Sequence, residues 1–135
     1  MTRQVAAAGL MLALAGAGCG NRRAPDLFVL TRTGAIPGAA LTLRVYDDGQ
    51  VRCNGGERRR LPEELLLDAR RIARELNELA PAALPPRPRS ILRYRMRLEE
   101  GTVRFADNSR GQARAMFETQ AFARRVARDV CELLR

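Results

Sequence analysis

The sequence predicts a single α+β domain in which an antiparallel sheet of about five strands carries two helices on one face. Three observations support this prediction. Short segments alternate apolar and polar residues with the period of a strand, two long segments repeat apolar residues with the period of a helix, and glycines or prolines separate them. The order of elements is β-β-β-α-β-β-α, and we place this domain at residues 27–135.

The first three strands are predicted at residues 27–32, 41–47 and 50–54. The first is a short apolar run. The second and third alternate apolar and polar residues, as expected for strands buried on one side. Asp48 and Gly49 lie between them and form a dipeptide that favours a two-residue hairpin turn. The sequence therefore predicts a hairpin in the first half of the domain.

Residues 61–80 give the clearest helical pattern, because their apolar residues recur every three or four positions. Pro62 suits the first helical turn, where its missing N–H group is not needed. Glu63 follows it and suits the positive end of the helix. The outer side of this helix offers two ion pairs at i and i+4, Arg71–Glu75 and Arg74–Glu78.

Four prolines between positions 81 and 88 end this helix and predict a stiff connector. Two strands follow at 91–98 and 102–106, and the first has apolar residues on one face and arginines on the other. A second long helix is predicted at 113–134. Both helices can then cover the apolar side of the sheet.

Residues 1–18 have the three parts of a secretory signal peptide. Arg3 supplies the charge near the N-terminus, and an apolar stretch at 5–15 follows. This stretch is too short to span a bilayer as a helix. Small residues come next, so the sequence predicts an exported protein.

Cys19 directly follows the small residues, and the run Gly16-Ala17-Gly18-Cys19 resembles the lipobox of bacterial lipoproteins. The resemblance implies that Cys19 carries a lipid and becomes the new N-terminus, with residues 19–26 as lipidated cysteine and tether. The protein would then bind the outer face of the cell membrane through this lipid. The run Ala15-Gly16-Ala17 also fits ordinary signal peptidase, which would release a diffusible secreted protein.

Three cysteines occur in the chain: Cys19, Cys53 and Cys131. An odd number in an exported protein leaves one cysteine without a partner. If Cys19 carries the lipid, Cys53 and Cys131 remain to form a disulfide in an oxidising compartment. The alternative is that they are two separate buried thiols.

The composition argues against catalysis. The chain has no histidine, so it can build neither a serine–histidine triad nor a histidine-containing metal site. Phosphate-binding loops, dinucleotide fingerprints and zinc-ligand spacings are absent from the sequence. Acidic pairs at 47–48 and 99–100 precede glycines and fit turns. We therefore expect no enzyme activity, no cofactor and no metal.

All 24 basic residues are arginines, and the formal net charge is +9. Coding bias in a G+C-rich genome would replace lysine by arginine throughout a chain, and selection for guanidinium chemistry is the alternative. Strand alternation predicts that six arginines point away from the helices. These six residues are Arg44, Arg52, Arg93, Arg95, Arg97 and Arg104.

Such a face suits an anionic polymer of the cell envelope or lipid headgroups, and a solvated face without a partner is the alternative. Nucleic acid fits less well, because aromatic residues make up only 4% of the chain. Tyr46 is the only aromatic residue predicted on this face, and a stacking platform needs more.

The segment from Thr31 to Gly38, TRTGAIPG, resembles the opening of the emfourin-type protealysin inhibitors. The helix start at 61–64 and the strand pair that contains Tyr94 also resemble this family. Typical members have a second glycine where this chain has Ala35, and they lack the two cysteines and the export signal. The resemblance implies a compact α+β domain that binds a secreted metallopeptidase through the loop at 33–39. The candidate contact residues in this loop are Gly34, Ile36, Pro37 and Gly38.

These observations predict an exported, lipid-anchored, non-catalytic binding protein of the bacterial cell envelope. Inhibition of a peptidase is the most specific form of this prediction. The alternative function is a cationic module that holds anionic envelope polymers or lipid headgroups on its arginine-rich sheet face.

Overall fold

The computed structural model describes residues 26–133. The predicted signal peptide, Cys19 and nearly all of the tether lie outside the described residues. Asp26, which we assigned to the tether, instead begins the first strand. Neither of the two described helices has the length and apolar character that a membrane span requires.

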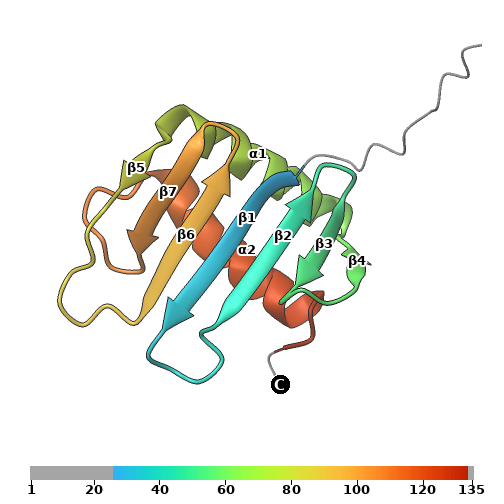
Figure 1. The fold of residues 1–135 in the computed structure, drawn as a ribbon, viewed down its shortest axis with the longest axis horizontal. Helices are drawn as coiled ribbons and strands as arrows, with labels where there is room; N and C mark the ends of the chain where they lie inside the picture. The colour runs from blue at the N-terminus through green and yellow to red at the C-terminus, as the bar shows by residue number, and fades with distance from the viewer. Residues whose placement is uncertain (1–25, 134–135) are drawn as a thin grey trace, which may run out of the picture.

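The domain has two layers, a seven-stranded sheet and two helices that cover one of its faces, as Figure 1 shows. The α+β prediction is confirmed. The sheet is larger than predicted and has the strand order β4-β3-β2-β1-β6-β7-β5. The elements are β1 Asp26–Gly34, β2 Leu41–Tyr46, β3 Gln50–Cys53, β4 Arg58–Arg60, α1 Glu63–Leu79, β5 Ala82–Ala83, β6 Leu92–Leu98, β7 Gly101–Ala106 and α2 Arg114–Asp129.

Two short edge strands were not predicted. β4 consists of three arginines, so it has no apolar alternation to reveal it, yet it pairs antiparallel with β3. β5 has only two residues and pairs parallel with β7. The sheet is therefore mixed, although all its longer strand pairs are antiparallel.

Most predicted boundaries differ by one or two residues, and two elements show the differences that matter here. Thr33 and Gly34, which we assigned to a loop, extend β1 because they continue its pairing with β6. The second helix ends at Asp129 rather than continuing to 134. Glu132 has a positive φ of 56°, a left-handed conformation that turns the chain away from a helical path. The Nη1 group of Arg59 also donates a hydrogen bond to the carbonyl of Val130 at 2.9 Å.

The core fills the space between the two layers. Apolar side chains of the central strands meet those of both helices, and the rings of Phe28 and Phe122 pack edge to face with centroids 5.9 Å apart. Leu65, Ile72 and Leu76 supply the buried side of α1. Among the described residues, no helix lies over the opposite face of the sheet (Figure 1).

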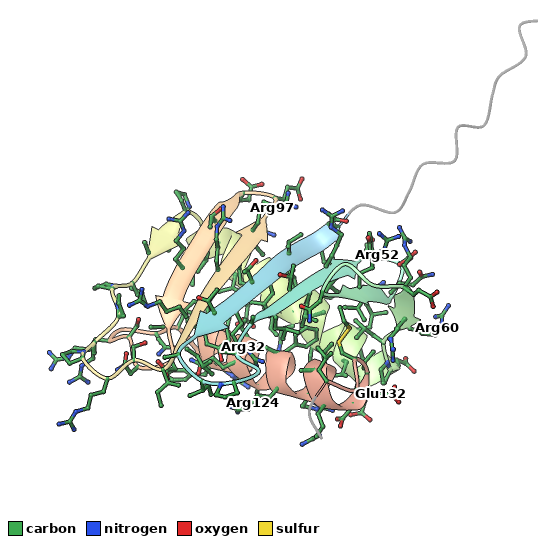
Figure 2. The ribbon with its side chains drawn as sticks, turned by 60° about the horizontal axis from the view of Figure 1, so that its bottom comes forward. Arg32, Arg52, Arg60, Arg97, Arg124 and Glu132 are labelled. Atoms are coloured by element: carbon green, nitrogen blue, oxygen red, sulfur yellow. A yellow bond between two sulfur atoms is a disulfide. The ribbon has the colours of Figure 1, made fainter. Side chains whose placement is uncertain are left out.

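A disulfide joins Cys53 at the end of β3 to Cys131 beyond α2, and Figure 2 shows it as a yellow bond. The two residues are 78 positions apart, and their Cα atoms are 5.9 Å apart. This is the pairing that the cysteine count predicted. A crosslink over so long a loop removes unfolded-state entropy worth about 4–5 kcal/mol. The bridge therefore fixes the end of the helical layer to one side of the sheet.

Candidate functional site

The six arginines predicted to point away from the helices are all exposed in strands of the uncovered face. The strand register brings some of them into direct opposition. Arg44 lies opposite Arg52 on neighbouring strands, and Arg95 lies opposite Arg104. We refer to the uncovered side of the sheet with its arginines as the open face.

The run at β4 adds two arginines to the open face. Arg58 lies opposite Arg52, and Arg60 lies opposite Gln50. The guanidinium carbon of Arg58 sits 4.0 Å from the centre of the Tyr46 ring, a cation–π contact. Tyr46 is buried beneath this contact, with an exposed fraction of 4%. It was the only aromatic residue expected to be available on this face, and it offers no surface on which a base could stack.

Charge is distributed unequally between the two layers. The two helices together carry no net charge. α1 has three arginines and five acidic residues, and α2 has four arginines and two acidic residues. The strands carry ten arginines and one acidic residue, Asp26. The strand arginines are Arg32, Arg44, Arg52, Arg58, Arg59, Arg60, Arg93, Arg95, Arg97 and Arg104.

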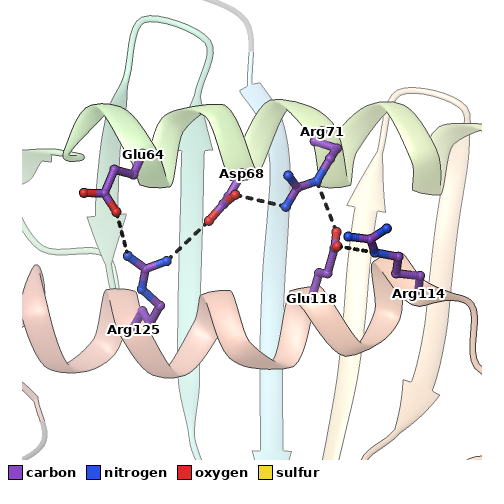
Figure 3. Close-up of polar contacts among 6 residues, drawn as sticks. All are labelled: Glu64, Asp68, Arg71, Arg114, Glu118 and Arg125. Carbon is purple, nitrogen blue, oxygen red and sulfur yellow. Dashed lines mark hydrogen bonds and ion pairs between the residues drawn. The ribbon is translucent and has the colours of Figure 1, made fainter.

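On the helical layer, arginines lie between carboxylates and form a connected chain of ion pairs, drawn in Figure 3. Arg71 contacts Asp68 at 3.0 Å and Glu118 of the other helix at 3.3 Å. These carboxylates, Glu118 above all, raise the pKa of Arg71 above its ordinary value. The remaining pairs in this chain are Arg125–Asp68 at 3.4 Å, Arg125–Glu64 at 3.3 Å and Arg114–Glu118 at 2.8 Å.

The predicted pairs along α1 are wrong. Arg71 pairs with Asp68 and with α2 instead of with Glu75, and Arg74 has no carboxylate within 4.0 Å among residues 26–133. The carboxylate of the second helix lies close enough to take Arg71 away from its predicted partner. A single-helix pattern cannot reveal that choice.

The open face has far fewer compensating carboxylates. Arg44 and Arg97 share Asp26 at 3.6 and 4.0 Å, and Arg58 reaches Asp48 at 3.7 Å. In the part of the chain that the structure describes, five further arginines of this face have no carboxylate within 4.0 Å. They are Arg52, Arg60, Arg93, Arg95 and Arg104.

Like charges directly opposite each other in a sheet are destabilising by roughly 0.2–1 kcal/mol per pair. The open face has three such pairs: Arg44–Arg52, Arg52–Arg58 and Arg95–Arg104. The fold tolerates this repulsion on one face while it balances charge on the other. Residues that lower the stability of the fold, as these opposed arginines do, are expected at functional sites.

The loop between β1 and β2, the other candidate contact region, is held from within the domain. Arg32 is buried on the helix-facing side of β1, and its Nε donates to the carbonyl of Ala39 at 2.9 Å. Its Nη2 donates to the carbonyl of Gly38 at 3.0 Å. The Ala35 N–H donates to the carbonyl of Ile91 at 3.3 Å. These bonds fix the loop at both ends.

Gly34 is required where the loop leaves β1. A Cβ atom at this position would lie 2.3 Å from the Ile91 carbonyl oxygen, which is backbone and cannot move aside. Pro37 and Ile36 are exposed at the tip, and Ile36 has an exposed fraction of 49%. The loop therefore presents an apolar side chain from a constrained backbone. The sequence pattern identified the loop, but it gave no sign that Arg32 holds it.

Tyr94 lies across from Arg32 in the neighbouring strand and stacks on Phe105 with ring centroids 5.2 Å apart. Its buried hydroxyl has no hydrogen-bond partner among the described residues. Burial raises the pKa of this hydroxyl above its ordinary value, and the charges of Arg32 and Arg124 oppose the rise.

Among residues 26–133, no three side chains of the metal-ligating types lie close enough together to hold a metal ion. No family model, no curated protein and no solved structure matches this chain. The open face and the loop that Arg32 holds are the two candidate functional regions of this chain.

Proposed function

We propose that this chain is an exported, non-catalytic binding protein that holds an anionic polymer of the cell envelope against its open face. The observation that supports this proposal is the opposition of Arg95 to Arg104 and of Arg44 to Arg52 on a face with a single strand carboxylate. A bound polyanion would relieve this repulsion. Binding energy and the release of local repulsion then act in the same direction.

The spacing of the arginines suits repeated phosphate or carboxylate groups. Neighbouring strands lie about 4.8 Å apart, so arginines in one cross-strand row recur at short, regular intervals. In one row, Arg52, Arg44 and Arg97 are interrupted only by Val29 of the central strand. A guanidinium group can bind two oxygens of one phosphate or carboxylate. The covered ring of Tyr46 favours a polymer without bases.

The direct test is binding of inorganic polyphosphate over a series of salt concentrations. In the variant Arg95→Gln/Arg104→Gln, we expect the dissociation constant to rise at least tenfold. The slope of log affinity against log salt should fall by about two, because two ionic contacts are lost. The matched control is Arg74→Gln/Arg124→Gln, which removes the same charge from the helical layer.

We expect the control variant to bind like the original protein. If both double variants lose affinity equally, the open face has no special role and net charge alone attracts the polymer. If neither loses affinity, the proposed binding surface is wrong.

A second candidate function, inhibition of a secreted metallopeptidase, is supported by the held loop. Preorganised loops bind without a large ordering penalty, and Arg32 supplies such preorganisation here. The variant Ile36→Asp should abolish inhibition across a panel of metallopeptidases, and Arg95→Gln/Arg104→Gln should leave it intact. Failure of the original protein to inhibit any member would leave the polymer as the partner.

The anchor on Cys19 is a separate part of the proposal and has its own test. Intact mass of the protein from its native membrane fraction should show a diacylglyceryl group on a chain that begins at Cys19. A lipid-free chain that begins at Gly18 would mean a diffusible protein, and it would leave Cys19 as a spare thiol.

A further inference from the structure

A hollow of about 480 Å³ lies on the open face between the strands β1, β6 and β7 and the segment that follows β5. This volume is within the range of small-molecule sites. Most of its lining is apolar, although it lies among charged residues. The residues that matter here are Thr33 on β1, Pro85 and Pro86 on the outer wall, and Arg93, Arg95 and Arg104.

The proline wall of the hollow is fixed to the domain. The Leu84 N–H donates to the carbonyl of Arg104 at 2.9 Å, which continues the pairing of β5 with β7. The buried hydroxyl of Ser109 donates to the Pro85 carbonyl at 2.9 Å. Proline also restricts the backbone of the wall itself. The hollow is therefore formed before any ligand arrives.

The charged part of the hollow is unbalanced. Arg95 and Arg104 are directly opposite each other, so their Cβ atoms are only about 5 Å apart and both side chains can reach one anion. Arg93 lies two positions from Arg95 on the same strand face. Within the described residues, none of the three has a carboxylate partner. A single anionic group would complement them.

We propose that this hollow binds one single-chain anionic amphiphile, with its phosphate or carboxylate between Arg95 and Arg104 and its apolar chain against Pro85 and Pro86. The proposal rests on the anion-binding role of the open face and names a ligand for one part of it. A polymer phosphate without an apolar group would satisfy the arginines but leave the apolar wall in water. The amphiphile satisfies both.

Calorimetric titration with inorganic phosphate, hexyl phosphate and decyl phosphate, each below its micelle concentration, tests the proposal. We expect the affinity to rise about fourfold for each methylene group that the hollow buries. Inorganic phosphate should bind weakest. Equal affinity for hexyl and decyl phosphate would overturn the proposal.

Filling the hollow provides the second test. Ala83 lies in β5 opposite Arg104 and lines the hollow, so Ala83→Phe should remove the dependence on chain length. The matched control, Ala40→Phe, adds the same ring at an exposed position that does not line the hollow. Thr33→Phe enters from the β1 side and replaces Ala83→Phe if that variant fails to fold.

The outcomes separate this inference from the proposed function. Polyphosphate should still bind both phenylalanine variants, because their arginines are intact. If polyphosphate binds but chain length has no effect, only the amphiphile is excluded. If polyphosphate does not bind the original protein, the proposed function fails instead. The proposal of a single-chain ligand is overturned if Ala83→Phe and Ala40→Phe bind phosphatidylglycerol vesicles equally well and monomeric decyl phosphate does not bind. The open face would then bind a lipid bilayer.

Discussion

The arginines of the two sides of the sheet have opposite surroundings. On the helix-facing side, Arg32 and Arg59 donate hydrogen bonds to backbone carbonyls, and helical arginines such as Arg71 lie between carboxylates. On the open face, Arg95 and Arg104 face each other without an acidic partner among the described residues. The same side chain therefore contributes to stability on one side and opposes it on the other.

This contrast bears on the origin of the arginines. The formal charge of +9 equals the excess of arginines over acidic residues in the strands, because the helices are balanced and so is the rest of the sequence. Coding bias would account for arginine in place of lysine, but it would act on every element alike. The low strand propensity of aspartate and glutamate explains part of the imbalance. It does not explain why neutral threonine is not used instead at the opposed positions.

The largest effect on stability is expected for Arg32→Leu. This change leaves the carbonyls of Gly38 and Ala39 without their donor, and hydrogen bonds from charged groups are worth about 1.5–3 kcal/mol. We expect the free energy of unfolding in urea to fall by about 2 kcal/mol. Unchanged stability would show that the inward arginines are not structural, which would remove the contrast between the two sides.

A smaller loss is expected when the helical chain of ion pairs is interrupted. Glu118→Gln removes the carboxylate that joins Arg71 and Arg114. These groups are partly exposed, so we expect a loss of only about 0.5–1 kcal/mol at low salt. Urea unfolding measures it, and Glu78→Gln on α1, which has no arginine within 4.0 Å in the described part of the chain, is the control.

The open face should respond in the opposite direction. Arg95→Thr removes the repulsion from Arg104 and introduces a residue that favours strands, so the protein should become more stable by about 0.5 kcal/mol. Salt screens this repulsion, so the gain should shrink at high ionic strength. A loss of stability in Arg95→Thr would contradict the view that this arginine is kept at the expense of the fold.

The smallest effect at neutral pH is expected for Tyr94→Phe, because the hydroxyl has no partner among the described residues. The raised pKa of Tyr94 predicts a difference at high pH. The folded protein holds this proton more tightly than the unfolded chain, whose tyrosine has a pKa of about 10. Stability is therefore complete below about pH 10 and declines as the pH rises toward the folded pKa.

Unfolding measured across this pH range should show a steeper alkaline decline for the original protein than for Tyr94→Phe. Tyr46 is present in both proteins, so the difference reports on Tyr94 alone. Parallel curves would mean that burial does not raise the pKa of Tyr94.

The sequence predicted those elements whose residues show a regular apolar pattern, and it predicted the disulfide. Alternation identified β2 and β6, helical periodicity identified α1 and α2, and the cysteine count identified the bridge between Cys53 and Cys131. The sequence did not reveal β4, because three consecutive arginines carry no apolar signal and pair only once β3 is in place.

The main features of the candidate site depend on register. Alternation placed Arg95 and Arg104 on one face, but only the pairing of β6 with β7 puts them opposite each other. The partners of Arg71 and the bonds of Arg32 likewise depend on how distant segments meet. The hollow beside Arg104 forms where the segment after β5 returns to β7, and no local pattern signals that approach.

The two short edge strands decide how this protein can meet copies of itself. An open sheet edge offers unpaired backbone groups to which another strand can add, and this is a common route to aggregation. Here one edge is the all-arginine strand β4, and the other is the two-residue strand β5 next to Pro81. The positive charge of β4 repels the same strand of a second copy. β5 is too short to pair with an added strand. Both edges of the sheet are thereby protected against the addition of a further strand.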